Sequence, residues 1–537
     1  MAELAMDIIK LLVHLVNGVI FLITLGPRLV DGLSRRVWSK AERIDSGTYT
    51  ESNSVHLAYD GHGNALAVSN EYYNVYARYF TPGSGWGKPE LIDHTRNAVD
   101  PEKEVRGNMD DPEAYFDSHG NAVAVWVGGT GYDDIKGYMH ETWNNWYTTG
   151  IGWGKAERFK HTPGEHNPVK MARDTLGNTI AVWSHYADNR STLLAQTRTA
   201  SSEWCKPLAI AECHGNARPI QISFDTKGNA LVFWRTDKEG KNARGRLSLY
   251  INHYSSVTGW GKANIISKVM DSYHMDTLAH AFDSKGNAIV VCSFMDSTDN
   301  EKQIHIWAKR YDTSKGWVKA VRIDPGVRSE YSGHVSESVQ PKIAFDLRDN
   351  AIVVWTQVNG NPQGGIWTNC YTPDQGWGKA SAITKTDNEQ SNHQLAVDAR
   401  GNAVVIWRQR NGLAASYYSV DVGWSIPQHL YPNIGNSYSS YDPKIVFDPE
   451  GNAIAIWWHR EFLYTIIQSI QYTPGKGWGK PIPVTRDYTN KAGYPKMSID
   501  NQGIAHVVWE QRDNGSSHTH HWTSHLLKPR KKIAARK

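Results

Sequence analysis

The feature that most constrains the fold is a short element that recurs nine times along the 537-residue chain. It reads approximately Asp-x-x-Gly-Asn-Ala and is followed by an apolar run that often ends in Trp. Successive copies are 50 to 63 residues apart. The first residues of the nine copies are Asp60, Asp117, Asp174, Asp225, Asp283, Asp346, Asp398, Asp448 and Asp500. Self-similarity at such a period is typical of proteins built from repeated structural units.

A second element alternates with the first. It reads approximately Gly-Trp-Gly-Lys and precedes another apolar segment. Lys stands two places after Trp in eight of nine copies, and the copy at Trp424 is the exception. The nine tryptophans are Trp38, Trp86, Trp153, Trp204, Trp260, Trp317, Trp377, Trp424 and Trp478. We interpret them as packing residues between repeats, and the nine aspartates as turn formers.

Each repeat predicts four short strands, as the copy around Asp448 illustrates. The first two strands are expected at Lys444–Phe447 and Ala453–Trp457, joined by a tight turn in which Gly adopts positive φ. The third and fourth are expected at Tyr464–Tyr472 and Pro481–Val484. Four antiparallel strands in every repeat of this length predict a β-propeller blade.

The order of the two elements predicts how the series closes. Trp38 precedes every Asp element, and no Trp element follows Asp500. The segment Val37–Ile44 is therefore expected to complete the blade that begins at Pro495, which removes the open sheet edges. We predict an all-β chain with a single propeller of about nine four-stranded blades over residues 37–528. A division into two smaller rings is the alternative.

Residues 1–36 differ from the repeats and predict one hydrophobic helix. The run Leu11 to Pro27 is 17 residues long and uncharged. The polar residues follow a 3,4 spacing and form a narrow stripe, so most of the helix surface is apolar. Two interpretations stay open: a membrane-embedded or interfacial anchor, and a helix packed on its own protein or on a partner.

Charge indicates partners and orientation. The net charge is +4, and the last ten residues contribute six Lys or Arg, so the body without them has a balance of −2. A nucleic-acid-binding body is disfavoured, because it requires a basic face. Basic residues after the hydrophobic run favour a cytoplasmic location for the large domain, while the composition is also compatible with the cell envelope or surface. Residues 529–537 form a basic tail.

The Asp-x-x-Gly-Asn turn, for example Asp117-Ser118-His119-Gly120, resembles the turns of bacterial sialidase-like and NHL-type propellers. The resemblance covers residues 37–528 and implies a propeller fold. It differs from the sialidase motif in having two residues between Asp and Gly. Sialidases also carry an arginine triad, a Tyr–Glu pair and an acidic Asp, none of which can be assigned here from spacing.

One candidate site is an aromatic stretch within residues 128–150. Aromatic faces can stack on sugar C–H faces, and the neighbouring acids and amides can bind hydroxyls. The candidate glycan-binding residues are Tyr132, Asp133, Asp134, Trp143, Trp146 and Tyr147. The alternative is extra hydrophobic packing at an elongated hairpin.

The second candidate site is a ring of polar residues, each four places before a turn aspartate. First strands line the channel of a propeller, so these residues are expected to surround the axis. They are His56, Glu113, Lys170, Gln221, Lys342, Gln394, Lys444 and Lys496, and only Ala279 is apolar. Four lysines against one glutamate favour an anionic ligand; a water-filled channel is the alternative.

Other chemistry is sparse. The four cysteines match no zinc or redox spacing, and no nucleotide loop or metalloprotease motif occurs. His518 and His520 share one strand face, a spacing that can hold a metal, but an exposed edge of the last blade is the preferred interpretation. We expect no metal and no cofactor.

The leading functional prediction is a non-enzymatic binding or scaffold protein, held at a membrane by residues 1–36, that binds a glycan or a protein partner. The alternatives are a structural subunit of a larger membrane complex and a sialidase-like glycoside hydrolase.

Overall fold

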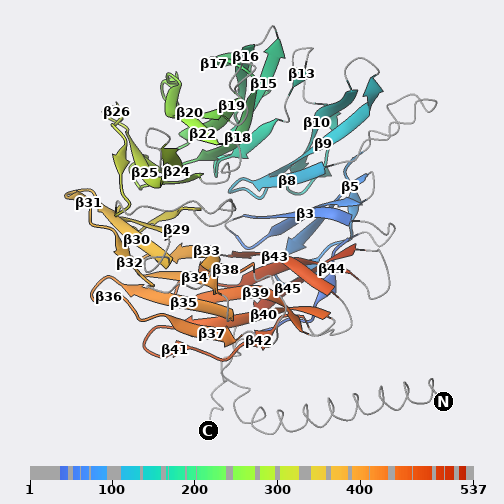
Figure 1. The fold of residues 1–537 in the computed structure, drawn as a ribbon. Coiled ribbons are helices and arrows are strands. Elements are labelled where there is room, and N and C mark those ends of the chain that lie inside the picture. The colour runs from blue at the N-terminus through green and yellow to red at the C-terminus, as the bar shows by residue number, and fades with distance from the viewer. Residues whose placement is uncertain are drawn as a thin grey trace, which may run out of the picture. The chain divides into compact units, whose positions relative to one another are not determined.

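In the computed structural model, every regular element of the described residues is a β-strand (Figure 1). The structure describes residues 37–45, 52–60, 62–71, 74–93, 110–133, 137–158, 165–166, 169–187, 190–200, 202–237, 246–271, 278–296, 303–325, 340–357, 365–384, 390–409, 412–432, 442–461, 464–485, 491–500, 502–512 and 519–527. The helix predicted for residues 1–36 and the tail 529–537 lie outside this part of the chain. None of the described residues belongs to a helix that could cross a membrane.

The strands form seven five-stranded sheets and one ten-stranded sheet. The first sheet contains β3 (Ser52–Tyr59), β4 (Ala65–Glu71), β5 (Asn74–Thr81), β6 (Gly85–Trp86) and β7 (Glu90–Leu91). The second contains β8 (Asp110–Phe116), β9 (Ala122–Asp133), β10 (Gly137–Thr148), β11 (Gly152–Trp153) and β12 (Glu157–Arg158). The third contains β13 (Glu165–His166), β14 (Lys170–Arg173), β15 (Thr179–Ala187), β16 (Arg190–Arg198) and β17 (Leu208–His214).

The next four sheets repeat this plan. The fourth contains β18 (Ala217–Phe224), β19 (Ala230–Asp237), β20 (Arg246–Ser255), β21 (Gly259–Trp260) and β22 (Asn264–Asp271). The fifth contains β23 (Leu278–Phe282), β24 (Ala288–Asp296), β25 (Gln303–Asp312), β26 (Gly316–Trp317) and β27 (Val321–Arg322). The sixth contains β28 (Lys342–Phe345), β29 (Ala351–Gln357), β30 (Gly365–Thr372), β31 (Gly376–Trp377) and β32 (Ser381–Ala382). The seventh contains β33 (Gln390–Val397), β34 (Ala403–Gln409), β35 (Gly412–Ser419), β36 (Gly423–Trp424) and β37 (Gln428–Pro432).

The ten-stranded sheet holds the last two repeats. The eighth repeat contributes β38 (Lys444–Phe447), β39 (Ala453–Glu461), β40 (Tyr464–Thr473), β41 (Gly477–Trp478) and β42 (Ile482–Pro483). The ninth contributes β43 (Lys491–Ile499), β44 (Ala505–Arg512) and β45 (Thr519–Leu527), with β1 (Val37–Trp38) and β2 (Glu42–Arg43) beside β45. A single parallel pair, Thr465 with Lys491, joins the two repeats.

The predicted four-stranded repeats are confirmed, with one difference in the fourth strand. The copy predicted as Pro481–Val484 is divided into β41 and β42, which both pair with β40. The same division occurs in copies with alanine at the position of Pro481, as in β31 and β32 on either side of Ala380, so it is a feature of the repeat and does not depend on proline.

The aspartate turns form as predicted. In the first copy, the Asp60 carboxylate accepts hydrogen bonds from the backbone N–H groups of His62 and Asn64, both at 2.9 Å. All nine aspartates accept a bond from the N–H four residues later. The Gly position requires positive φ, and Asp349, its one non-glycine occupant, adopts φ 64°. The Asp349 carboxylate also accepts a bond from Ser284 N of the preceding turn at 2.8 Å.

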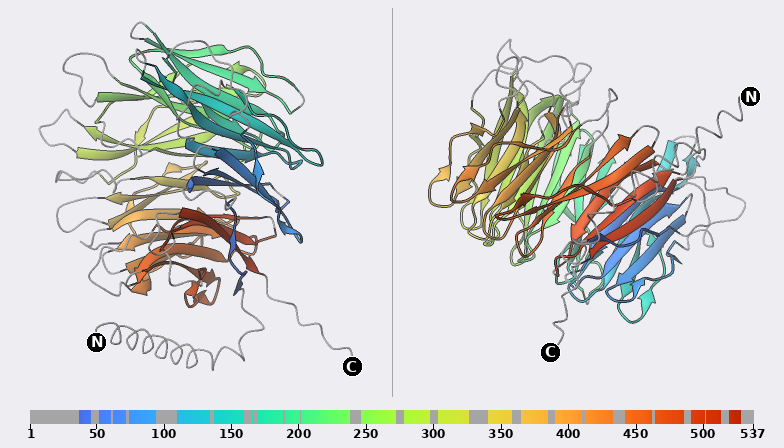
Figure 2. Two further views of the ribbon diagram at one scale, coloured as in Figure 1. Left: turned by 90° about the vertical axis from the view of Figure 1, so that its right-hand side faces the viewer. Right: turned by 90° about the horizontal axis from the view of Figure 1, so that it is seen from below.

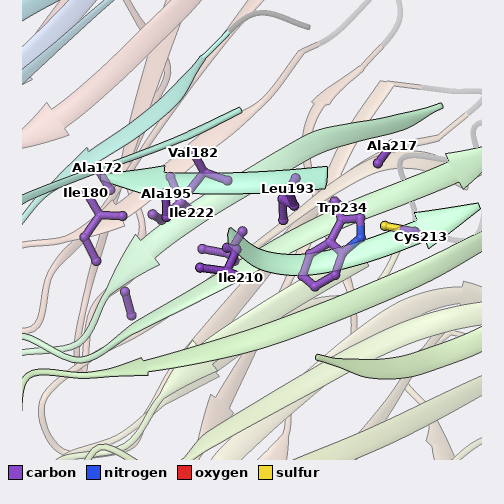
Figure 3. Close-up of a cluster of buried hydrophobic side chains, with 12 residues drawn as sticks. Ala172, Ile180, Val182, Leu193, Ala195, Ile210, Cys213, Ala217, Ile222 and Trp234 are labelled. Atoms are coloured by element: carbon purple, nitrogen blue, oxygen red, sulfur yellow. The ribbon is translucent and has the colours of Figure 1, made fainter. Parts of the chain in front are cut away.

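The hydrophobic core consists of layers between successive sheets. One layer places Ile180 and Val182 of β15 against Val232 and Trp234 of β19 (Figure 3). Corresponding clusters join the second strands of neighbouring sheets along the series. Figure 2 shows the sheets following one another in chain order. The series also returns to its start, because Val508 of β44 and Ile44 pack with Val55 and Ala67 of the first sheet.

The third strands meet neighbouring sheets through several kinds of side-chain pair, and two of the five junctions share the same stacked Tyr–Tyr pair. Tyr79 stacks on Tyr147 of the next sheet with a centroid separation of 4.9 Å. The other pairs are Trp146 with Arg198 at 4.0 Å, His253 with Tyr311 at 4.0 Å, Arg310 with Tyr371 at 5.7 Å, and Tyr417 with Tyr472 at 4.5 Å.

The N-terminal segment pairs with the last strand, as predicted. The chain divides into two compact units, residues 1–40 with 524–537 and residues 41–523. In the first unit, β1 pairs with the end of β45. In the second, β2 pairs antiparallel with Thr523 and Trp522 of β45. The buried Asp45 carboxylate then accepts a hydrogen bond from His521 N at 2.9 Å.

The same bond recurs inside three other sheets, seven residues after the Trp of the second element. Asp324 accepts from Ile306 N, Thr384 from Ile366 N and Thr485 from Ile467 N, each at 3.1 Å. We call this contact the fourth-strand clip. Its presence at Asp45 shows that residues 41–45 take the fourth-strand position in the sheet of β43, β44 and β45.

Candidate ligand site at the first strands

The first strands of the nine repeats are neighbours in a continuous series. They are β3, β8, β14, β18, β23, β28, β33, β38 and β43. Contacts link successive members. The Ser223 hydroxyl of β18 hydrogen-bonds His280 Nε2 of β23, and Lys496 Nζ of β43 donates to Val55 O of β3 at 2.5 Å. The first strand of the ninth repeat, β43, therefore contacts β3 of the first repeat.

Five first strands carry a β-bulge just before the predicted channel residue. The irregularities fall at Ser52/Ser54, Asp110/Glu113, Pro219/Gln221, Ser391/Gln394 and Gly493/Lys496. Asn392 and Tyr494 lie inside two of these bulges and adopt φ 52° and 50°. Bulges redirect side chains, and strained backbone gathers at functional sites. The bulges therefore favour a ligand site near the N-terminal ends of the first strands.

One group of predicted residues forms a network across three sheets. His56 Nδ1 accepts a hydrogen bond from Ala114 N at 3.1 Å. Glu113 accepts from the Tyr115 hydroxyl and pairs with Lys170 Nζ at 3.2 Å. Burial and the Lys496 charge lower the pKa of His56 to about 4, so this histidine is neutral at pH 7. Burial and the Glu113 carboxylate raise the pKa of Tyr115.

The second group consists of two like charges, Lys342 and Lys444, which we call the lysine cluster. Burial and the neighbouring Lys444 charge both lower the pKa of Lys342. Lys444 Nζ pairs with Asp442 Oδ1 at 2.6 Å, and the side chains are 31% and 33% exposed. His393 is buried beside Lys342, and its Nδ1 lies 3.0 Å from Thr356 Oγ1. Burial and Lys342 lower the pKa of His393 to about 3, so it adds no charge at pH 7.

The remaining channel candidates flank these groups. Lys496 is exposed and lies near Glu510, whose carboxyl pKa is raised by burial. Gln221 is exposed and Gln394 half-buried. The structure thus brings His56, Glu113, Lys170 and Lys496 together, and Lys342 with Lys444. Their role in ligand binding remains a prediction.

The aromatic stretch is one hairpin, but its candidate residues lie at separate places along it. Tyr132 pairs with Tyr138, whereas Tyr147 pairs with Ala122. At about 3.3 Å per residue, nine residues of strand separate Tyr138 from Tyr147 by roughly 30 Å. Tyr132, which is paired with Tyr138, therefore does not share one site with Tyr147. Asp134 lies outside the described residues.

The C-terminal part of this hairpin is packed between sheets. Trp143 borders the core layer between the first and second sheets, and Tyr147 stacks on Tyr79. The Arg198 guanidinium covers the Trp146 ring at 4.0 Å. These contacts favour the packing interpretation, while sugar stacking on these rings remains a prediction.

Of the predicted histidine pair, the structure describes only His520. His520 Nδ1 lies 3.3 Å from Asp45 Oδ2, beside the fourth-strand clip. His518 lies outside the described residues. No group of three metal-binding side chains occurs among the described residues.

Several residues at this end of the first strands were missed from the sequence. Tyr115 lies two places after Glu113 on the same face of β8, a period that the sequence spacing offered. Asp442 lies two places before Lys444, just ahead of β38. Trp458 and Tyr494 come from different repeats, and their rings meet at 6.0 Å. No single-repeat pattern predicts that contact.

Comparisons with known proteins found no related sequence and only partial structural alignments. No protein-family model matches the chain, and no curated protein matches it. An ulvan lyase of a polysaccharide lyase family aligns at 12% identity over 71% of this chain and 95% of its own, with a TM-score of 0.36. An endo-arabinase from Bacteroides thetaiotaomicron aligns at 15% identity over 47% of this chain and 94% of its own, with a TM-score of 0.28. A Hadza microbial sialidase aligns at 10% identity over 58% and 65%, with a TM-score of 0.32. At these values the likeness concerns repeated β-sheets alone.

Proposed function

We infer that this protein is a non-enzymatic binding propeller whose first strands hold an anionic ligand, a glycan or a partner protein. Residues 37–528 would form one nine-bladed ring, because core layers join the first eight repeats in order, one strand pair joins the eighth repeat to the ninth, and a further layer returns from the ninth repeat to the first. The ligand would bind where the first strands meet.

The observation that carries the proposal is the lysine cluster. Burial and the nearby Lys444 charge both lower the pKa of Lys342, so a second positive charge lies close to a partly desolvated ammonium group. Asp442 pairs with Lys444 at 2.6 Å and also attracts Lys342, so one carboxylate balances two ammonium groups. An anion placed between them would relieve the repulsion and gain charge-assisted hydrogen bonds.

The proposal is tested by replacing Lys342, Lys444 and Lys496 with glutamine together. Each charge-assisted bond is worth about 1.5 kcal/mol or more, and 1.4 kcal/mol is tenfold in affinity, so binding should fall by about a hundredfold or more. Calorimetry with a heparin oligosaccharide and with polyglutamate as probes, and dextran as the neutral reference, measures the change.

The matched control is the exposed triple variant Lys88, Lys155 and Lys262 to glutamine, which changes the net charge equally away from the first strands. Equal losses in both variants would show that the attraction comes from overall charge, and the lysine cluster would then not be a site.

The glycosidase alternative rests on one observation, the hydrogen bond between Tyr115 and Glu113. A tyrosine beside a glutamate is part of what a sialidase requires. Here the burial of Tyr115 opposes its ionisation, and Arg173 of the adjacent strand is held by Asp117 at 2.7 Å. Sustained turnover of a fluorogenic sialoside that is lost in Tyr115→Phe would replace the binding proposal with this one.

We also propose that residues 1–36 hold the protein at a membrane. The support is the uncharged run from Leu11 to Pro27. Deleting residues 1–36 should move the protein from the vesicle-bound to the free fraction in flotation with vesicles that contain anionic lipid. Unchanged flotation would contradict the anchor. Stoichiometric partners that co-purify in mild detergent only with the full chain would favour a complex subunit instead.

A further inference from the structure

A pair of aromatic rings lies next to the lysine cluster. Trp458 of β39 and Tyr494 of β43 have ring centroids 6.0 Å apart and an interplanar angle of 50°. Tyr494 is 64% exposed, which is unusual for a large aromatic side chain in a strand. The two residues come from the eighth and ninth repeats, so the pattern within one repeat does not predict their contact.

The backbone at Tyr494 is strained. Its φ of 50° lies in the left-handed region, which bulky side chains rarely adopt. Tyr494 also lies in the bulge between Gly493 and Lys496. Because the exposed ring gains little from burial, packing alone does not account for this conformation. Strained residues of this kind cluster at ligand sites.

The sheet register places the lysine cluster beside the aromatic pair. Lys444 is directly opposite Ile456, so Trp458, two residues further, shares the face of Lys444. Diagonal neighbours of this kind have Cβ atoms roughly 7–8 Å apart. Trp458 and Tyr494 therefore continue the surface that carries the Lys444 ammonium group.

One carboxylate, Asp442, pairs with Lys444 Nζ at 2.6 Å, and the other charges around the pair are mostly basic. Lys491 and Lys496 are exposed on the same strand as Tyr494, and Arg460 is exposed near the end of β39. Burial raises the pKa of the nearby Glu510 carboxyl, which opposes its negative charge. The surroundings thus favour a polar, acidic ligand over an apolar peptide segment.

We propose that Trp458, Tyr494 and Lys444 form a subsite for an acidic saccharide, with a sugar ring on the aromatic pair and its carboxylate or sulfate on the lysine. Aromatic faces bind the C–H face of a pyranose, and an ammonium group beside them selects a charged sugar over a neutral one. This subsite rests on the proposed anion site and specifies its ligand class.

The test compares an oligogalacturonate with its methyl ester, which has the same sugar rings without the charge, and with polyglutamate, which has the charge without the rings. Tyr494→Gly removes the ring and tolerates the positive φ, whereas Tyr494→Phe keeps the ring. We expect Tyr494→Gly to weaken oligogalacturonate binding about tenfold and to leave polyglutamate unchanged. Tyr494→Phe should bind like the original protein, and the methyl ester should bind at least tenfold more weakly than the acid.

The outcomes separate the subsite from the anion site. Tyr494→Gly could leave the binding of both ligands unchanged while the Lys342/Lys444 double glutamine variant weakens the binding of both. In that case the subsite is overturned and the anion site stands. If Tyr494→Gly weakens polyglutamate equally, the ligand is an acidic peptide and the saccharide assignment fails. If the original protein binds neither acid, both proposals fail. Thermal unfolding of each variant confirms that binding losses do not come from unfolding.

Discussion

Replacing Asp45 with alanine will destabilise the protein by about 2–3 kcal/mol, because a buried N–H loses a charged acceptor. The carboxylate accepts from His521 N, and the two residues are 476 positions apart in sequence. Its loss should release β2 from β45. The free energy of unfolding in urea, together with hydrogen exchange of β44 and β45, measures the effect.

Asp324→Ala is the matched control, since Asp324 makes the same clip to Ile306 N within one sheet. We expect both variants to lose a similar amount of free energy of unfolding. Only Asp45→Ala should show faster hydrogen exchange in β44 and β45. Unchanged exchange in β45 of Asp45→Ala would contradict a closing role for residues 41–45.

The protein will lose stability progressively as the pH falls from about 6.5 towards 4. His253, His393, His459 and His521 are buried, and burial lowers their pKa values to about 4, 3, 4 and 4. The unfolded chain binds protons at an ordinary pKa of about 6.5 while the folded chain does not, so stability falls as the pH drops below 6.5. At 1.36 kcal/mol per pKa unit, each histidine costs about 2 kcal/mol at pH 5, and four cost roughly 8 kcal/mol.

Thermal unfolding midpoints at pH 7.5, 6.0 and 5.0 measure this dependence. His393→Asn removes one titrating group and leaves a polar partner for Thr356 Oγ1, so its midpoint should vary less with pH. A constant midpoint across this range would show that the histidines take up protons in the folded state, contrary to their burial.

The repeat was readable from the sequence because its turns depend on local chemistry. The bonds from Asp60 to the next residues use one side chain and its own turn, so the motif predicts the structure directly. The pairing of the N-terminal segment with the last strand also followed, because element order alone required it. The clip at Asp45, Asp324, Thr384 and Thr485 was visible as a polar residue seven places after Trp, and only the structure shows its bond.

The site was predicted less completely, for a physical reason. The position four residues before each aspartate identified Lys342 and Lys444, because equivalent residues of a repeat occupy equivalent places. The contact of Trp458 with Tyr494 depends on a bulge and on two different repeats. Likewise, the register of β9 and β10, which separates Tyr132 from Tyr147, cannot be read from composition. Features that break the repeat need the structure.

The third-strand contacts have a consequence for how such a chain can change. Tyr79 meets a tyrosine, Trp146 meets an arginine and His253 meets a different tyrosine, so each sheet carries a surface that fits its own neighbour. A chimera in which two sheets exchange places would set Arg198 or Arg310 against the wrong ring. Blade order is thus encoded at the junctions that carry distinct pairs, whereas the Tyr–Tyr stacks of the first and seventh sheets with their successors are alike and would tolerate exchange.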